Sequence, residues 1–294
     1  DDVRQAIEAG KPGTAVQVVP RARHLAKENG IDLAQVQGSG PSGRILVADV
    51  ERAMAAQASA AAAEIVPLTG LRKIIATRMA DSARTTAPVT LTTEADVTEL
   101  VGLREKLVSA WRPHKTRPLE IDLIVKATAQ SLREHPRLNA TLVDSEIRLL
   151  EEINIGVAMA VPDGLMVPVV NGADRRDALA IAQQIRDYAR RSRDADLSVD
   201  DVTGATFTIT SLSNYEIDAF TPIIDKRQVA ILGVGRIVEK PAVHRGEIAI
   251  RSMMFLSLTF DHRALDGVPA GEFLGAVKAK LEDPGWMGSN GAEG

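Results

Sequence analysis

The chain has 294 residues, 45% hydrophobic and 25% charged, which is enough for one large hydrophobic core and a small satellite domain. Its 35 basic and 39 acidic residues give a net charge of −4, so no general field for polyanions arises and nucleic acid is not expected as a partner. The absence of cysteine excludes disulfides, thiol nucleophiles and thiolate metal sites, and fits a reducing compartment.

No apolar run reaches membrane-spanning length and the N-terminus lacks a signal-peptide core, so no membrane partner is expected. The chain begins with Asp1 rather than Met, and we expect further residues upstream. Residues 1–18 are polar and interrupted by Gly and Pro, which predicts a linker. Residues 19–55 then predict a small helical module: a helix over 21–29 stopped by Gly30, a turn over 31–36, a loop over 38–43 and a helix over 45–54.

The loop from Gly38 to Gly43 spells G-x-G-x-x-G, the pattern of dinucleotide-binding loops. That pattern requires a buried strand before it and a βαβ unit around it. No convincing strand precedes Gly38, and Pro41 lies inside the loop. We therefore interpret the loop as a tight turn in the small module.

Residues 53–64 are rich in Ala and predict a partly helical connector, with the linker itself at 56–64. One large domain is expected over 65–294. Its predicted strands are 89–97, 140–143, 147–150, 153–160, 165–170, 205–210, 229–238 and 248–260. Its predicted helices are 99–109 with Thr98 as N-cap, 119–134, 177–193 and 268–282. Strands and helices alternate without a regular βαβ rhythm, which favours an α/β sandwich with a mixed sheet.

His262 follows the last predicted strand, and Asp266 and Gly267 come after it. A histidine at this position is held by a rigid element and can still reach substrate, as a general base must. Asp266 could orient the imidazole, or it could only shape the turn before Gly267. The other four histidines are scattered and cysteine is absent, so no metal site is expected.

Residues 65–284 resemble the catalytic domain of the dihydrolipoamide acyltransferases, the core components of 2-oxo acid dehydrogenase complexes. Residues 20–54 resemble that family's peripheral subunit-binding domain, including Gly30-Ile31-Asp32 and the 38–44 loop. The matching stretches of the large domain are 74–79, 94–98, 153–158, 162–169, 206–210, 221–224, 230–235 and the His262 segment.

The resemblance implies a chloramphenicol-acetyltransferase-like fold that forms homotrimers and larger cages of 24 or 60 chains. It also implies transfer of an acyl group from a dihydrolipoyl thioester to coenzyme A. His262 would be the base, and Thr210 would stabilise the oxyanion from a facing chain, although Thr210 alone reads as an ordinary strand residue. The lipoyl group is expected on a domain missing from this sequence.

Arg23, Lys27 and Arg44 match basic positions with which the family docks dihydrolipoamide dehydrogenase or the 2-oxo acid decarboxylase component. The alternative is a solvated basic face. The implied location is the bacterial cytoplasm or the mitochondrial matrix. Two segments depart from the family pattern: 211–218 lacks its usual glycines, and Asp225-Lys226-Arg227 replaces the usual Asn-Pro-Pro.

The acyl group is expected to be acetyl, with branched-chain acyl and succinyl as alternatives. A catalytically silent scaffold of the same fold is the non-enzymatic alternative, and the retention of His262, Asp266 and Thr210 argues against it. A free-standing acetyltransferase for small molecules is a third alternative. The subunit-binding module argues against that reading, because such an enzyme needs no docking partner.

Overall fold

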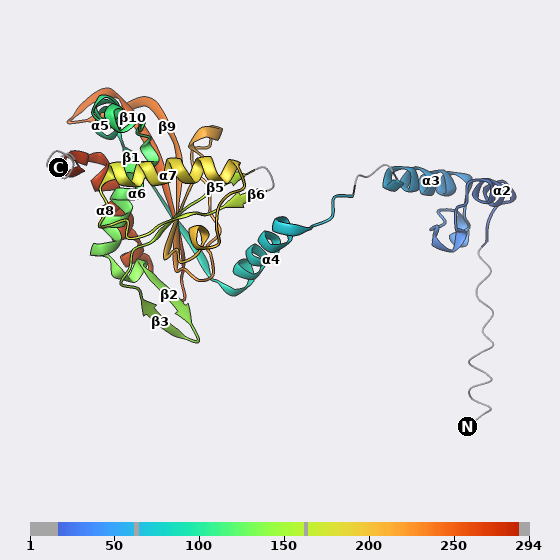
Figure 1. Ribbon diagram of the computed structural model, residues 1–294. Helices are drawn as coiled ribbons and strands as arrows, with labels where there is room; N and C mark the ends of the chain where they lie inside the picture. The colour runs from blue at the N-terminus through green and yellow to red at the C-terminus, as the bar shows by residue number, and fades with distance from the viewer. Residues whose placement is uncertain (1–16, 62–64, 162–163, 288–294) are drawn as a thin grey trace. The chain divides into compact units, whose positions relative to one another are not determined.

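The computed structural model describes residues 17–61, 65–161 and 164–287 (Figure 1). Most of the expected 1–18 linker, part of the 56–64 linker, Pro162-Asp163 and the last seven residues of the expected large domain lie outside these ranges. The chain divides into two compact units, Asp1–Pro67 and Leu68–Gly294, which are described separately. No helix in the described ranges is long and apolar enough to cross a membrane.

Over residues 17–61, which the structure describes, the small unit contains two helices and two short 3-10 turns around a core of its own. Its elements are α2 (Pro20–Glu28), η1 (Leu33–Gln35), η2 (Pro41–Gly43) and α3 (Val47–Ala61). The buried residues Ala22, Ala26, Ile45 and Val50 form the core. The 38–43 loop is a turn in a helical module, as expected, and α3 continues into the Ala-rich segment.

Asp49 organises this small core from the first turn of α3. Its carboxylate accepts hydrogen bonds from the backbone N–H groups of Ser39 and Leu46. These bonds stabilise the ionised form and lower the pKa of Asp49 to about 2. One buried carboxylate thus ties the glycine-containing loop to the helix, which a module with so few apolar residues requires.

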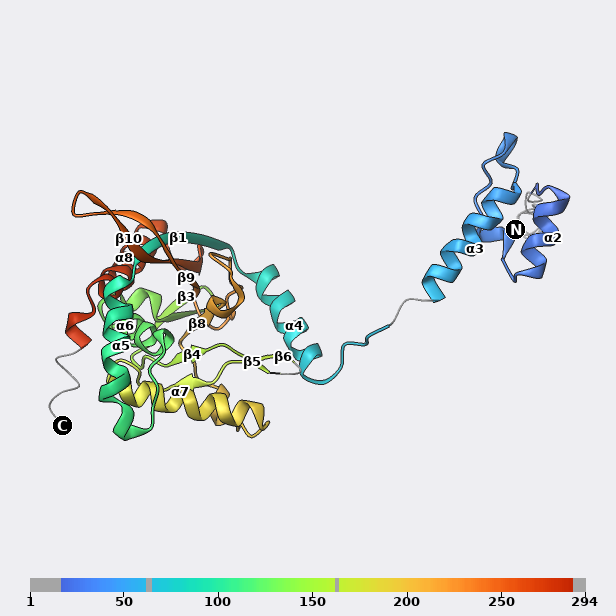
Figure 2. The same cartoon turned by 90° about the horizontal axis from the view of Figure 1, so that it is seen from above.

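The large unit is built on a six-stranded mixed sheet in the order β1-β10-β9-β8-β4-β7 (Figure 2). The β1/β10, β10/β9 and β4/β7 pairs are antiparallel, while β9/β8 and β8/β4 are parallel, which confirms the expected mixed sheet. The strands are β1 (Pro88–Asp96), β4 (Ile155–Val157), β7 (Val169–Val170), β8 (Phe207–Ser211), β9 (Ala230–His244) and β10 (Glu247–Asp261). Two hairpins lie outside this sheet: β2 (Ala140–Val143) with β3 (Glu146–Leu149), and β5 (Met159–Val161) with β6 (Gly164–Met166).

Four helices pack with the sheet to form the main core. They are α5 (Thr98–Ala110), α6 (Glu120–Glu134), α7 (Ala178–Arg193) and α8 (Gly267–Glu282). The helix α8 packs on β1 and β10, and α6 packs between α8 and α7. Phe207 of β8 meets Phe273 of α8 edge to face, with ring centroids 5.6 Å apart. The expected helices and their approximate ends are confirmed.

The structure corrects several sequence-based expectations. Residues 153–160 form two short strands in different sheets, and 165–170 likewise divides between β6 and β7. Thr98 does not cap α5; it is the first helical residue, and Asp96 accepts hydrogen bonds from its N–H and hydroxyl. Helix α4 (Gly70–Thr85) was not expected, and it lies at the edge of the unit away from α5 and α8 (Figures 1 and 2). Among its residues only Ser82 is buried, and its apolar residues Leu71, Ile74, Ile75 and Met79 form only a short stripe at helical spacing.

The 211–218 segment forms a tight turn without the family's usual glycines. Glu216 takes φ 55°, in the left-handed region that favours glycine. The segment then lies directly on β9, where Arg236 N–H donates to the Ile217 carbonyl at 2.8 Å. A Cβ on Gly235 would come within 1.8 Å of the Asp218 carbonyl oxygen, so this contact requires glycine in the strand instead of in the turn.

Asp122 is a fully buried carboxylate at the start of α6. It accepts hydrogen bonds from Leu119 N–H and, at 2.5 Å, from Arg186 of α7. Burial raises the pKa of Asp122 to about 6, although Arg186 and the Leu119 N–H oppose that rise. The folded state therefore binds more protons than the unfolded state between about pH 4 and 6, and this group's contribution to stability falls as pH rises through that window.

We expect Arg186→Gln to destabilise the large unit by about 3–5 kcal/mol at pH 8, because it leaves an uncompensated buried carboxylate. The loss should be smaller at pH 5, where Asp122 can be protonated. Urea unfolding followed by tryptophan fluorescence measures this unit, since Trp111 and Trp286 both belong to it. Arg190→Gln, which removes an exposed ion pair with Asp187 on the same helix, is the control and should cost at most about 1 kcal/mol. An equal loss at both pH values would contradict the buried-charge explanation.

Candidate active site

His262 directly follows the last residue of β10 and begins the turn that leads to α8. Its backbone N–H donates to the Ala87 carbonyl at 2.9 Å, immediately before β1. The side chain is 47% exposed, and its ring lies 5.7 Å from the ring of Phe260. The imidazole is therefore carried by a fixed backbone and remains open to a reactant.

Asp261, one residue earlier, holds this corner of the sheet together. It is buried, and its carboxylate accepts two-pronged hydrogen bonds from Arg263 and a third from Ala87 N–H. Burial raises the pKa of Asp261, but the bonds from Arg263 and Ala87 outweigh it, and the resulting pKa lies below its ordinary value. Asp261 therefore stays ionised and structural beside the histidine.

Asp266 lies at the N-cap position of α8, with its side chain 86% exposed. Its Oδ1 is 3.9 Å from His262 Nδ1, which is within ion-pair range but too long for a hydrogen bond. The structure thus brings the predicted pair together without joining them directly.

Thr210 lies on β8, half-buried, and is not adjacent to His262 in the same chain. Thr210 pairs with Gly233 on β9, and Gly233 pairs with Ser257 on β10. His262 lies just beyond the end of β10, two strands away from Thr210. At about 3.3 Å per residue and 4.8 Å per strand, the two Cα atoms are roughly 19 Å apart. Within a single chain, the described residues therefore do not assemble base and hydroxyl into one centre.

The family of the chain follows from its match over both units. Residues 60–288 match the model of the 2-oxoacid dehydrogenases acyltransferase catalytic domain, and residues 16–51 match the e3 binding domain. The chain belongs to the acyltransferases of the 2-oxo acid dehydrogenase complexes. Enzymatic acyl transfer in the core of such a complex is the activity of this family.

Curated relatives carry different acyl specificities. The acetyltransferase component of the acetoin cleaving system of Bacillus subtilis is 37% identical over 92% of this chain and 70% of its own length. The lipoamide acyltransferase component of the branched-chain complex of Pseudomonas putida is also 37% identical, over 93% and 68%. The succinyltransferase component of the 2-oxoglutarate complex of Haemophilus influenzae is 33% identical over 90% and 70%. The acyl group is therefore not determined by overall similarity.

Solved acyltransferase cores share the fold of the large unit. Azotobacter vinelandii dihydrolipoamide acetyltransferase, studied for the roles of a serine, a histidine and an asparagine in catalysis, matches with TM-score 0.74 and 35% identity over 76% of this chain and 93% of that one. The cubic core of a pyruvate dehydrogenase multienzyme complex matches with TM-score 0.74 and 34% identity over the same shares.

In this acyltransferase, the three basic residues selected for docking are all exposed. Arg23 and Lys27 are one turn apart on α2, and Arg44 precedes Ile45, whose carbonyl accepts the Val19 N–H at the start of α2. No hydrogen bond or ion pair is found for their side chains within the described ranges. Likewise, no group of three or more His, Cys, Asp or Glu that could bind a metal occurs among the residues the structure describes.

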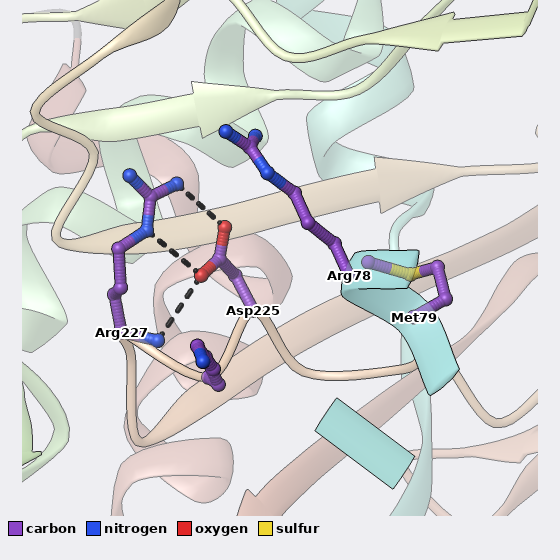
Figure 3. A pocket seen from close by; sticks show the side chains of 5 residues that line it. Arg78, Met79, Asp225 and Arg227 are labelled. Atoms are coloured by element: carbon purple, nitrogen blue, oxygen red, sulfur yellow. Dashed lines mark hydrogen bonds and ion pairs between the residues drawn. The ribbon is translucent and has the colours of Figure 1, made fainter. Parts of the chain in front are cut away.

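Sequence reasoning missed a pocket of about 220 Å³ between α4 and the loop before β9 (Figure 3). It is lined by Arg78, Met79, Asp225, Lys226 and Arg227. The available signal was the departure from Asn-Pro-Pro at 225–227, which the sequence analysis noted without assigning it a role. Arg78 could not be selected, because only the fold places α4 against this loop.

Proposed function

We propose that this acyltransferase moves an acetyl group between a dihydrolipoyl thioester and coenzyme A, with His262 as general base. The observation that carries the proposal is the geometry at the end of β10, where a backbone fixed on both sides presents a half-exposed imidazole. The sources of the relatives are bacterial, which favours the bacterial cytoplasm over the mitochondrial matrix.

His262 would act on the thiol of coenzyme A. A thiol with a pKa of about 8.5 is only a few per cent thiolate at neutral pH. Neutral imidazole removes the thiol proton as the sulfur attacks the thioester carbonyl, forming a tetrahedral intermediate with a negative oxygen. Collapse breaks the bond to the dihydrolipoyl sulfur, which leaves as a thiolate and takes the proton from the imidazolium. One thioester replaces another, so no acyl-enzyme is needed.

Thr210 would donate its hydroxyl hydrogen to the tetrahedral oxyanion. Because Thr210 and His262 are roughly 19 Å apart within one chain by strand geometry, this role requires Thr210 of a facing chain in a homotrimer. The half-buried position of Thr210 on a strand of the central sheet is compatible with such a contact. Trimers would in turn assemble into the larger core.

Sequence separations in a relative support these three residues together. In the Azotobacter vinelandii enzyme, the serine precedes the histidine by the same number of positions as Thr210 precedes His262. The asparagine follows that histidine by the same number as Asp266 follows His262. Threonine supplies the same hydroxyl as serine, and Asp266 replaces a neutral amide with a carboxylate that can attract the imidazolium.

The small unit would dock dihydrolipoamide dehydrogenase, the decarboxylase component, or both, through Arg23, Lys27 and Arg44. The match to the e3 binding domain and the exposure of all three residues support this role. The lipoyl group would be carried by a domain outside this sequence and would visit the active site.

We expect His262→Ala to abolish acyl transfer and leave assembly intact, because transfer loses the base, a contribution of about 10²–10⁴. His262→Asn should behave likewise, since it preserves size and removes basicity. Turnover with acetyl-CoA and dihydrolipoamide and the sedimentation coefficient are the measurements. His244→Ala, at another partly exposed histidine, is the control and should retain activity. Near-normal turnover of His262→Ala would refute the base assignment.

Thr210→Ala should lower kcat by about 10²–10³ with little change in the KM for coenzyme A, because the bond forms mainly in the transition state. Thr210→Ser should be nearly unaffected. Thr208→Ala is the matched control on the same strand, where the buried hydroxyl donates to Gln228 instead of facing substrate. A rise in KM alone for Thr210→Ala would instead assign the hydroxyl to ground-state binding.

Residues 1–60 should bind the dihydrolipoamide dehydrogenase of the same organism, and binding should weaken with salt. Reversing charge at Arg23 and Arg44 should remove binding without unfolding the module. Arg21→Glu is the control, because two residues along a helix turn its side chain by about 200° from Arg23. Calorimetric titration at low and high salt measures these effects. Unchanged affinity in the double variant would show that these residues only form a solvated basic surface.

A further inference from the structure

The 225–227 pocket is linked to the candidate active site through the backbone segment that leads into β9. The Val229 carbonyl accepts the Asp261 N–H at 2.9 Å, and Arg227 lies two residues before Val229. Asp261 directly precedes His262, so this hydrogen bond joins the segment that leads from the pocket into β9 to the end of β10 that carries the imidazole. The far wall belongs to α4, whose Ser82 donates to the Ile224 carbonyl at 2.5 Å.

Two of the three cationic side chains in this pocket form ion pairs, and the third has none that the structure describes. Arg227 donates to both oxygens of Asp225, at 3.0 and 2.8 Å, and Lys226 forms an ion pair with Asp81. Arg78 faces the same carboxylate from α4, and no hydrogen bond is found for its side chain among the residues the structure describes (Figure 3). The three cationic side chains are thus balanced by only two carboxylates, those of Asp225 and Asp81, which leaves one positive charge in excess. The N–H groups of Arg78 can donate hydrogen bonds to a bound anion.

We propose that this pocket binds a small anionic group carried by the thioester substrate, with Arg78 as the principal contact. A guanidinium suits carboxylate and phosphate alike, because its planar donors match paired oxygens. The group is either a phosphate of coenzyme A or the free carboxylate of a dicarboxylic acyl chain. This inference rests on the proposed acyl transfer.

Asp225 sets the strength of the site. Its carboxylate occupies Arg227 and competes with an incoming anion for Arg78. Removing that negative charge should strengthen anion binding. If the Asp225–Arg227 ion pair were only structural, removing it would weaken binding or destabilise the fold. Opposite effects of neutralising Arg78 and Asp225 therefore distinguish a binding site from a structural contact.

The first test is the kinetics of Arg78→Gln. KM should rise about tenfold, with kcat retained, for substrates that carry the recognised group, as expected for one lost charge-assisted hydrogen bond. If the group is a phosphate, the effect appears with acetyl-CoA and disappears with S-acetylpantetheine. If it is a carboxylate, the effect appears with succinyl-CoA and not with acetyl-CoA. Lys73→Gln, an exposed cation on α4 outside the pocket, is the control.

The second variant, Asp225→Asn, should lower KM for the same substrate by several-fold. A gain of affinity cannot come from misfolding. The proposal is overturned if Arg78→Gln matches Lys73→Gln on every substrate, if it lowers kcat on all of them equally, or if Asp225→Asn gives no gain.

Binding without turnover separates this proposal from the proposed function. Inorganic pyrophosphate and succinate should be tested alone as probes, by the rise in unfolding temperature that a ligand of the folded state produces. A rise that Arg78→Gln removes and Lys73→Gln retains supports the pocket even if the protein transfers no acyl group. Normal acyl transfer with no dependence of any probe or substrate on Arg78 overturns the pocket alone.

Discussion

The position of His262 depends on backbone hydrogen bonds at the end of β10. Val229 accepts the Asp261 N–H on one side, and Ala87 accepts the His262 N–H on the other. The Asp261 carboxylate closes the corner by accepting from Ala87 N–H and Arg263. With these bonds in place, the imidazole needs no direct hydrogen bond to Asp266 to be directed outward. Positioning a base by main-chain contacts leaves its side chain free to react.

Buried charge is the recurring means by which helices and loops are joined to this core. Asp122 links α6 to Arg186 of α7, and Lys126 of α6 donates to the Asp174 and Arg176 carbonyls before α7. Burial lowers the pKa of Lys126, whereas nearby Asp174 and Asp177 oppose that change. Each such group is costly to bury alone and stabilising only with its partner, so these contacts specify which elements pack together.

A single chain does not bring His262 and Thr210 together. His262 lies exposed at one end of the sheet and Thr210 lies two strands away, so the proposed chemistry depends on a second copy of the chain. The proposed anion pocket beside β9 would add substrate recognition to the same subunit as the base. Under these proposals, one chain would supply the base and the anion contact, and a facing chain would supply the oxyanion donor.

The sequence by itself determined the mixed-sheet class, most elements, the family and the candidate residues His262, Asp266 and Thr210, because strand alternation, helix periodicity and motifs are local signals. It failed where local signals are weak or absent. Helix α4 buries only Ser82 and its apolar stripe is short. Residues 153–160 divide at Ala158, whose N–H is bonded to β8. Only the tertiary structure decided that Arg78 lies beside Asp225, about 150 residues further along the chain, and that Thr210 and His262 lie apart. Both results depend on strand order and helix packing, which no short stretch of sequence encodes.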